Sequence, residues 1–183
     1  MRLLDTAGPS AVTLRAVGDA AGISQSAPYR HFEDKRALLR AMARANLEYF
    51  NTAAEKAERD AQTPFGLLAH LVQAYFDFAR RYPVRYRFLA DIGREDSALG
   101  AEVRRTFGAV ASVVQAAQLA GQIRIGDAEQ VSALIFGAAY GMADFSRFGL
   151  MTNTSEEASS RGPAPDLAPL LLNLLADSGC REA

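Results

Sequence analysis

The stretch from residue 13 to residue 39 gathers side chains whose types suit contact with nucleic acid. A glutamine can pair bidentately with adenine, a serine can bond several bases, and an alanine methyl can contact the methyl group of thymine. Tyrosine, histidine and lysine side chains donate hydrogen bonds to phosphate oxygens. The candidate residues are Gln25, Ser26, Ala27, Tyr29, Arg30, His31 and Lys35. Their types and close spacing indicate a surface that reads bases and holds a phosphate backbone.

Two short helices and a tight turn are expected to position these side chains. Thr13 is a typical helix N-cap, and Gly22 can end the helix over residues 14–21 because glycine tolerates positive φ. Ser24 is expected to cap a second short helix, and Asp34 to cap a longer one whose free N–H groups attract phosphate. The apolar residues expected to fix the short helices are Val17, Ala21, Ile23 and Phe32. This is the pattern of a helix-turn-helix, whose second helix can enter a major groove.

At these positions the chain resembles the DNA-binding domain of the TetR family of transcriptional regulators. The matching motif is Thr13-x-Arg15, then Ala21-Gly22-Ile23-Ser24, then Tyr29-x-His31-Phe32-x-Asp34-Lys35-x-x-Leu38. The resemblance is specific over about residues 8–45. The family's first helix usually begins about a dozen residues earlier, so the first helix here is expected to be truncated before Gly8-Pro9.

The resemblance implies a role for each position of the motif. Bases are read by the residues at Gln25, Ser26 and Ala27, and phosphates are contacted by those at Tyr29, His31 and Lys35. Thr13 and Arg15 open the second helix, where some members touch base or backbone, and Arg30 can serve either purpose. Pro28 stands where the family often has a bulky apolar residue, which predicts a distorted or shortened recognition helix. Arg36, Arg40 and Arg44 follow at i,i+4 spacing, and we expect a solvated stripe rather than DNA ligands.

The rest of the chain is also expected to be helical, because alanine, leucine, arginine and glutamate dominate it and period-two β-branched runs are absent. The prediction is an all-α fold of about nine helices. It comprises an N-terminal three-helix helix-turn-helix domain, 1–45, and a larger C-terminal helical ligand-binding and dimerisation domain, 46–183. The later helices are expected over residues 35–59, 64–81, 84–93 and 98–121, and then from about 128 and 167, with caps at Thr63, Ser97 and Asp127 and a loop from Thr152 to Asp166.

The last two predicted helices carry a candidate dimer interface. The helix from Leu167 to Leu175 has apolar residues on more than one face, and the preceding helix carries small residues that permit close approach of two helices. We expect a four-helix interface about a two-fold axis, formed by Leu134, Gly137, Ala138, Gly141, Leu167, Leu170, Leu171 and Leu174. The alternative is that both helices belong to the interior of one subunit.

Aromatic residues of the C-terminal part are candidates for a ligand pocket. An apolar, aromatic set suits a flat or greasy molecule, although such residues can equally form plain core. The candidates are Tyr49, Tyr75, Phe76, Phe88, Phe107, Phe136 and Tyr140. No cofactor is expected.

Composition narrows the class of protein. Of 183 residues, 49% are hydrophobic and 22% are charged, as in folded globular chains. The net charge is −1, but the first 50 residues carry seven basic and five acidic side chains, an excess of +2. A single cysteine, Cys180, rules out a disulfide framework and a cysteine-built metal site. No apolar run reaches the length of a membrane span, and no leader is recognised, so a cytoplasmic protein without a membrane partner is expected.

Function follows as an expectation from these patterns. His70 and Asp77 form the one pairing with acid–base character, and surface ion pairing explains it more simply, so the chain is not expected to be an enzyme. We expect a bacterial, ligand-responsive homodimer that binds double-stranded DNA at a palindromic operator and is released by a small apolar or aromatic molecule. Repression is the family's usual mode. The alternative is a helical dimeric small-molecule-binding protein with weakened or lost DNA binding.

Overall fold

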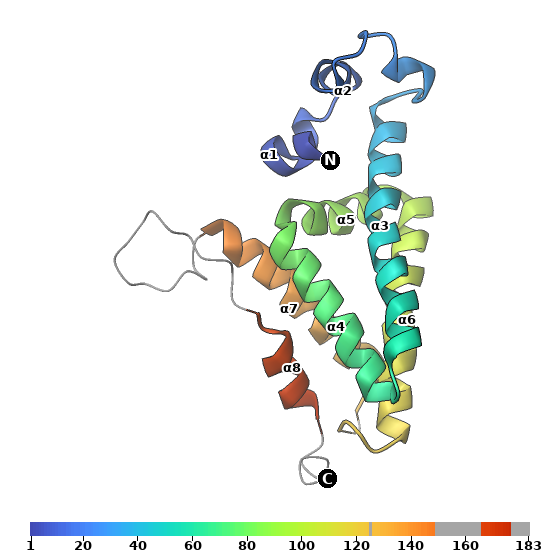
Figure 1. Cartoon of the computed structure of the whole chain (residues 1–183), viewed down its shortest axis with the longest axis vertical. Helices are drawn as coiled ribbons and strands as arrows, with labels where there is room; N and C mark the ends of the chain where they lie inside the picture. Colours follow the sequence, from blue (N-terminus) through green and yellow to red (C-terminus); the bar gives the residue numbers. More distant parts are fainter. Residues whose placement is uncertain (125, 149–165, 177–183) are drawn as a thin grey trace, which may run out of the picture.

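The computed structural model describes residues 1–124, 126–148 and 166–176. Most of these residues are helical, and their one β feature is an isolated bridge between Ile123 and Ala176 (Figure 1). The elements are α1 (Arg2–Ala11), α2 (Leu14–Ala21), a 3-10 helix η1 (Pro28–Arg30), α3 (Lys35–Asp60), α4 (Pro64–Arg81), α5 (Pro83–Glu95), α6 (Ser97–Leu119), α7 (Ala128–Phe148) and α8 (Ala168–Leu175). The expected all-α fold is confirmed. Cys180 and most of the expected loop (152–165) lie outside the described residues.

Most helix starts follow the predicted caps. The Ala16 N–H donates to Thr13 Oγ1 at 3.1 Å, and the Ala37 N–H donates to the carboxylate of Asp34 at 2.6 Å. Gly22 ends α2 in the left-handed region, with φ of 66°. Further hydrogen bonds confirm the caps Thr63, which accepts from the Gly66 N–H, and Asp127, which accepts from the N–H groups of Glu129 and Gln130.

Two predicted caps are wrong. Ser24 caps no α-helix: turns follow it, and its hydroxyl lies 3.3 Å from that of Ser26. The recognition helix is therefore shortened to the 3-10 helix η1, which begins at Pro28, a residue without an N–H group. At the start of α6, Asp96 replaces Ser97 as the cap, because its carboxylate accepts the Leu99 N–H at 3.1 Å.

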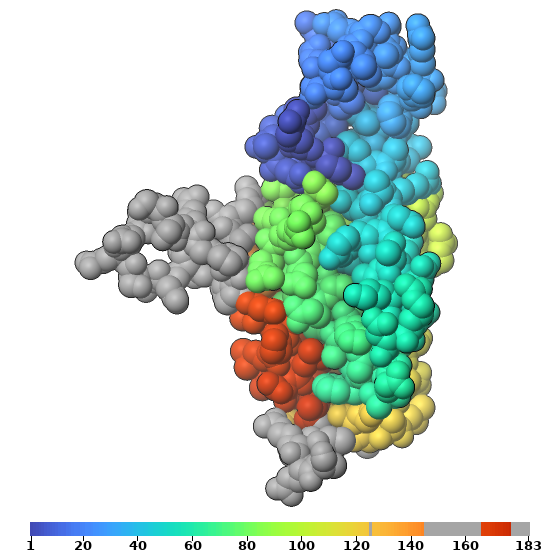
Figure 2. All heavy atoms as spheres, viewed as in Figure 1, coloured from blue at the N-terminus to red at the C-terminus, as the bar shows by residue number. Residues whose placement is uncertain are grey.

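The molecule is elongated, with the N-terminal elements at one end (Figures 1 and 2). We call residues 1–34, which contain α1, α2 and η1, the reading head. Helix α3 leaves the reading head and continues through the expected domain boundary at residues 45 and 46 until it packs on α4 and α6. Helix α5 packs against α1, so the reading head is supported by two helices of the larger part.

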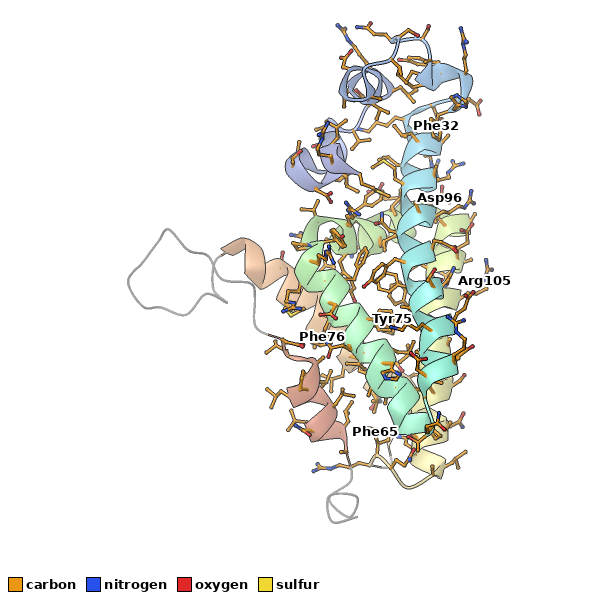
Figure 3. The ribbon with its side chains drawn as sticks, in the orientation of Figure 1. Phe32, Phe65, Tyr75, Phe76, Asp96 and Arg105 are labelled. Carbon is orange, nitrogen blue, oxygen red and sulfur yellow. The ribbon has the colours of Figure 1, made fainter. Side chains whose placement is uncertain are left out.

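Aromatic rings fill the centre of the larger part. Phe50 from α3, Tyr75 from α4, Phe107 from α6 and Phe136 from α7 form a connected cluster, with ring centroids 5.0–5.2 Å apart in successive pairs. Figure 3 shows Tyr75 on α4, with its ring in the space between α4 and α3. The cluster joins four helices, so it fixes their relative positions.

Candidate DNA-binding surface and ligand pocket

The recognition segment, residues 24–31, presents polar side chains at the end of the reading head. Gln25, Ser26 and Arg30 are exposed, and 59% of Tyr29 is exposed. Ala27 is half-buried, and Pro28 is buried beneath the segment. Four predicted DNA-contacting side chains of this segment are therefore open to solvent, while Ala27 is only partly accessible.

A glycine in α2 lets the recognition segment pack closely. A Cβ atom at Gly18 would lie 3.4 Å from the Ser24 carbonyl oxygen and 3.5 Å from Cγ of Pro28. The Gly18 carbonyl also accepts the Ile23 N–H at 3.1 Å, which closes the turn. The sequence interpretation missed Gly18, although a glycine inside a short amphipathic helix is a signal of close approach.

The apolar contacts of the reading head differ from those predicted. Val17 and Phe32 pack against the hydrophobic core, and Figure 3 shows Phe32 where the reading head joins α3. Ala21 and Ile23 are exposed instead, with 49% of Ile23 accessible. The close contact of Pro28 with α2 replaces the anchoring role expected of these two residues.

The remaining predicted contacts lie around the segment. Thr13 and Arg15 are exposed at the start of α2, and the Thr13 hydroxyl is engaged in capping. His31 is exposed directly after η1. Lys35 is also exposed, and its ammonium donates to the Ser10 carbonyl at 3.0 Å. Since an ammonium has three donors, this bond fixes Lys35 beside α1 and leaves donors for a phosphate.

Arginines of α3 form ion pairs with the α5–α6 corner. Arg40 donates from Nε to Asp96 at 2.7 Å, and Arg36 lies 3.4 Å from the same carboxylate. Arg44 forms a fork on Glu102, at 2.7 and 3.0 Å. The stripe is solvent-exposed as expected, with 60%, 38% and 57% of the Arg36, Arg40 and Arg44 side chains accessible, but acids that are distant in sequence also pair with these arginines.

Asp96 is the centre of this contact (Figure 3). It is only 6% exposed, and the hydrogen bond from the Leu99 N–H holds its pKa below the ordinary value. Arg40 and Arg36 lower the pKa further, against the opposing effect of burial. The carboxylate therefore stays ionised at neutral pH while it caps α6 and binds α3.

A second ion pair joins α1 to α5. Arg85 donates to both carboxylate oxygens of Asp5, from Nε at 2.6 Å and from Nη2 at 2.5 Å. The Arg85 guanidinium also lies 4.2 Å from the ring centroid of Tyr82. The hydrogen bond to Asp5 raises the pKa of Arg85. The first helix of the reading head is thus fastened to the larger part through one bidentate contact.

An apolar pocket of about 390 Å³ opens between α5, α6 and α7. Its lining is Tyr86, Leu89, Ala90, Val103, Arg104, Phe107, Phe136, Gly137 and Tyr140. The volume is within the range of small-molecule sites. Three of the predicted ligand residues, Phe107, Phe136 and Tyr140, line it. The sequence interpretation did not single out Tyr86 or Arg104, because neither belongs to a recognisable motif.

The other predicted ligand residues lie outside this lining. Tyr75 packs directly behind it, with its ring centroid 5.2 Å from those of Phe107 and Phe136. Phe76 is fully buried, and Phe88 is buried beside a separate hollow between α1 and α5. Tyr49 is 41% exposed and packs on Phe78.

The predicted dimer residues divide between surface and core. Leu134 on α7 and Leu170 and Leu174 on α8 are 55%, 59% and 61% exposed. Gly137 is exposed, and the half-buried members are Ala138, Gly141 and Leu167. Leu171, by contrast, is buried in the core. Both helices pack on α4 and leave leucines uncovered.

The described residues contain no metal-binding cluster and no membrane-spanning helix. Among them no three His, Cys, Asp or Glu side chains gather as a metal site. No helix in this part of the chain combines the length and apolar character of a membrane span. Asp77 pairs with Arg80 at 2.9 Å rather than with His70.

Comparison with solved structures shows the same fold in DNA-binding regulators. A ketosteroid transcriptional regulator, KstR2 of Mycobacterium tuberculosis, superposes with a TM-score of 0.73 at 15% identity, covering 97% of this chain and 91% of that one. A Rhodococcus protein of unknown function gives 0.74 at 24% identity, with coverage of 96% and 91%. AibR, in complex with isovaleryl coenzyme A and operator DNA, gives 0.71 at 15% identity, with coverage of 95% and 92%. No curated protein sequence matches.

Family profiles match both parts of the chain. Residues 1–42 match the bacterial regulatory proteins of the tetR family, and residues 68–161 match the tetracyclin repressor-like C-terminal domain. The second match alone spans half of the chain, and it includes α5, α6 and α7, which form the pocket. The chain therefore belongs to the TetR family of transcriptional regulators.

Proposed function

We propose that this protein is a homodimeric bacterial repressor that binds a palindromic operator through two reading heads and is released by a small apolar or aromatic ligand. The observation that carries the proposal is the recognition segment, which leaves Gln25, Tyr29 and Arg30 uncovered at the end of the molecule. The protein would act in the cytoplasm, where bacterial DNA lies.

The recognition segment supplies both kinds of contact that a DNA reader needs. Gln25 and Ser26 can bond base edges in the major groove, and Arg30 can reach a base or a phosphate. Tyr29, His31 and Lys35 surround the segment with phosphate donors, and Thr13 and Arg15 extend this surface along α2. The burial of Pro28 against α2 holds the short segment in place. A 3-10 turn can therefore present these side chains to DNA as a longer recognition helix would.

Ligand response requires a path between pocket and DNA surface. Helix α5 supplies Tyr86, Leu89 and Ala90 to the pocket, and from another face it binds Asp5 of α1 through Arg85. Helix α6, the opposite wall, is bound to α3 through Asp96 and Glu102. A ligand that favours another position of these walls would shift the reading heads away from the spacing of about 34 Å, or a multiple of it, that a palindrome requires. A coupling of about 1–3 kcal/mol changes operator affinity roughly 5–150-fold.

Selection of bound fragments from a random DNA pool tests the DNA-binding part. We expect a palindromic consensus, because two identical reading heads related by a two-fold axis read inverted half-sites. If each dimer neutralises on the order of eight phosphates, the slope of log affinity against log salt should be near about −7. A flat salt dependence would refute DNA binding and favour the small-molecule-binding alternative.

A matched pair of arginine variants locates the DNA surface. Arg30→Ala should weaken operator binding by about tenfold or more, because a charge-assisted contact is lost. Arg59→Ala removes an exposed arginine at the far end of α3 and should leave binding unchanged. Equal effects of the two variants would show that binding depends on overall charge rather than on the recognition segment.

Calorimetry tests the coupling between ligand and operator. Ligand affinity measured with and without bound operator must differ if the two sites are linked, since linkage is reciprocal. We expect weaker ligand binding to the operator complex. Equal affinities would exclude release by ligand while leaving DNA binding intact.

A further inference from the structure

The polar side chains that line the pocket between α5, α6 and α7 are all hydrogen-bond donors. Its side chains are apolar apart from Tyr86, Arg104 and Tyr140. Each of these three can donate a hydrogen bond, one carries a positive charge, and no acidic residue belongs to the lining. A ligand with a cationic head would therefore meet no counter-charge there, whereas an anionic head would meet one.

Tyr86 is a largely buried residue of the pocket wall. It is 6% exposed, and its hydroxyl makes no hydrogen bond to the part of the chain that the structure describes. Burial raises the pKa of Tyr86, so the hydroxyl keeps its proton at neutral pH. A protonated hydroxyl in the pocket wall can donate to an acceptor on a ligand.

Arg104 is not among the ion-paired arginines of the described residues. Arg40 and Arg44 on α3, and Arg85 and Arg87 on α5, all pair with carboxylates. Arg104 lines the pocket and has no ion pair with any described residue. Its guanidinium lies along α6, with Nη1 3.3 Å from where a Cβ of Gly100 would stand. Arg104 is exposed, so it places a solvated positive charge at the rim of an apolar hollow.

We infer that the pocket binds an apolar carboxylic acid as its anion, with the apolar body against Leu89, Phe107 and Phe136 and the carboxylate paired with Arg104. This narrows the ligand class of the proposed function and rests on it. Guanidinium and carboxylate match in geometry as well as in charge, and the apolar walls take up the rest of the ligand. The same tail with a neutral or cationic head should bind more weakly.

A charge series on one tail tests the inference. Decanoate, 1-decanol and decylamine share a ten-carbon chain and differ in the charge of the head. Titration calorimetry on the full-length protein without DNA should give an affinity for decanoate at least about tenfold above that for decanol, since hydrogen bonds to charged groups are the stronger ones. Decylamine should bind no better than decanol.

Neighbouring arginines on α6 provide a matched control. Arg104→Gln should reduce decanoate affinity to that of decanol and leave decanol unchanged. Arg105→Gln should change neither, because Arg105 lies outside the pocket lining, at the outer edge of α6 in Figure 3. Tyr86→Phe should weaken both oxygen-bearing probes by roughly 2–10-fold through one lost hydrogen bond. Ala90→Phe, which fills the hollow, should abolish binding of all three probes.

Several results would overturn the inference. One is equal affinity of the wild-type protein for decanoate and decanol, and another is a preference for decanoate that Arg104→Gln does not remove. The inference also fails if the Ala90→Phe variant still binds the probes, or if the wild-type protein binds none of them. Operator binding without ligand is measured separately. A protein that binds operator and releases it with decanol as readily as with decanoate would keep the proposed function and lose the anionic ligand class.

Discussion

Single ionisable side chains of this protein take their roles from partners that are far away in sequence. Arg36 and Arg40 meet Asp96 from a distance of more than fifty residues, and Arg44 meets Glu102 in the same way. The acids lie at the start of α6, so the pairs bind α3 to the corner between α5 and α6. The arginines of α3 thus hold the helix that leaves the reading head against the larger part of the molecule.

Asp96→Asn should lower the free energy of unfolding at pH 7, because the amide can still cap α6 but no longer carries charge toward Arg40 and Arg36. The pKa of Asp96 is lowered in the folded state, so its contribution is complete above the ordinary carboxyl pKa of about 3.9 and is lost as pH falls through the lowered value. Urea unfolding at a series of pH values checks this. The gap between wild type and variant should close in acid.

Asp60→Asn, at the end of α3, is the control, and no change of that kind is expected from it. A gap between wild type and Asp96→Asn that persists unchanged to acid pH would contradict the role assigned to the Asp96 charge.

A glycine pair on α6 tests the tight corner between α5 and α6. A Cβ at Gly100 would lie 2.3 Å from the Gly93 carbonyl oxygen, which is backbone and cannot yield without moving α5. Gly100→Ala should therefore cost about 1–3 kcal/mol in free energy of unfolding. Gly108→Ala, on the same helix with open space around it, should instead stabilise by about 0.5–1 kcal/mol. Equal effects in chemical denaturation would show that helix propensity alone decides both.

At the scale of elements, α5 links the apolar pocket to α1 of the reading head. It contributes one wall of the apolar pocket and the arginine that binds α1. It begins at Pro83, directly after Tyr82, and ends before Asp96, so it is a short helix between two corners of the chain. In the proposed mechanism, α5 would carry a change in the pocket to the reading head.

Arg85→Lys should loosen α1 while leaving the larger part intact. Lysine keeps the charge but loses the two-pronged contact with Asp5 and the stacking on Tyr82. Hydrogen exchange should show faster exchange of the α1 amides and unchanged protection in α4. A double-mutant cycle with Asp5→Asn should give a coupling of about 1 kcal/mol. Unchanged α1 protection would contradict the fastening role of this pair.

At the scale of the whole molecule, uncovered leucines on α7 and α8 support assembly into a dimer. Leu134, Leu170 and Leu174 are large apolar side chains that one subunit leaves more than half exposed. Two-fold pairing of these helices would cover them and fix the separation of the two reading heads. The dimer that we propose would therefore be needed for operator recognition as well as for stability.

Leu170→Glu combined with Leu174→Glu should convert a dimer into monomers in sedimentation equilibrium, because charges would be buried without partners. Leu119→Glu is the matched control, since Leu119 is 85% exposed at the end of α6 and outside the predicted interface. It should leave the mass unchanged. A wild-type protein that sediments as a single chain at micromolar concentration would refute the two-fold mechanism.

Local patterns in the sequence were enough to predict the helical class and most of the helix boundaries. Thr13, Asp34, Thr63 and Asp127 cap helices through bonds to amides two or three residues ahead, and Gly22 ends α2 by its own backbone freedom. The DNA-binding motif was equally visible, because its residues are close together in the chain. Interactions within a few residues depend on local chemistry, so a single sequence reveals them.

Contacts between distant residues were decided by the tertiary structure alone. The pairing of Arg40 with Asp96, the packing of Gly18 on Pro28 and the arrangement of Tyr86 and Arg104 around one hollow all require helices to be placed in three dimensions. The periodicity of a helix shows which face is apolar but not which neighbour covers it. For this reason the sequence marked where DNA would be read, while the fold decided which aromatic residues line a pocket and which fill the core.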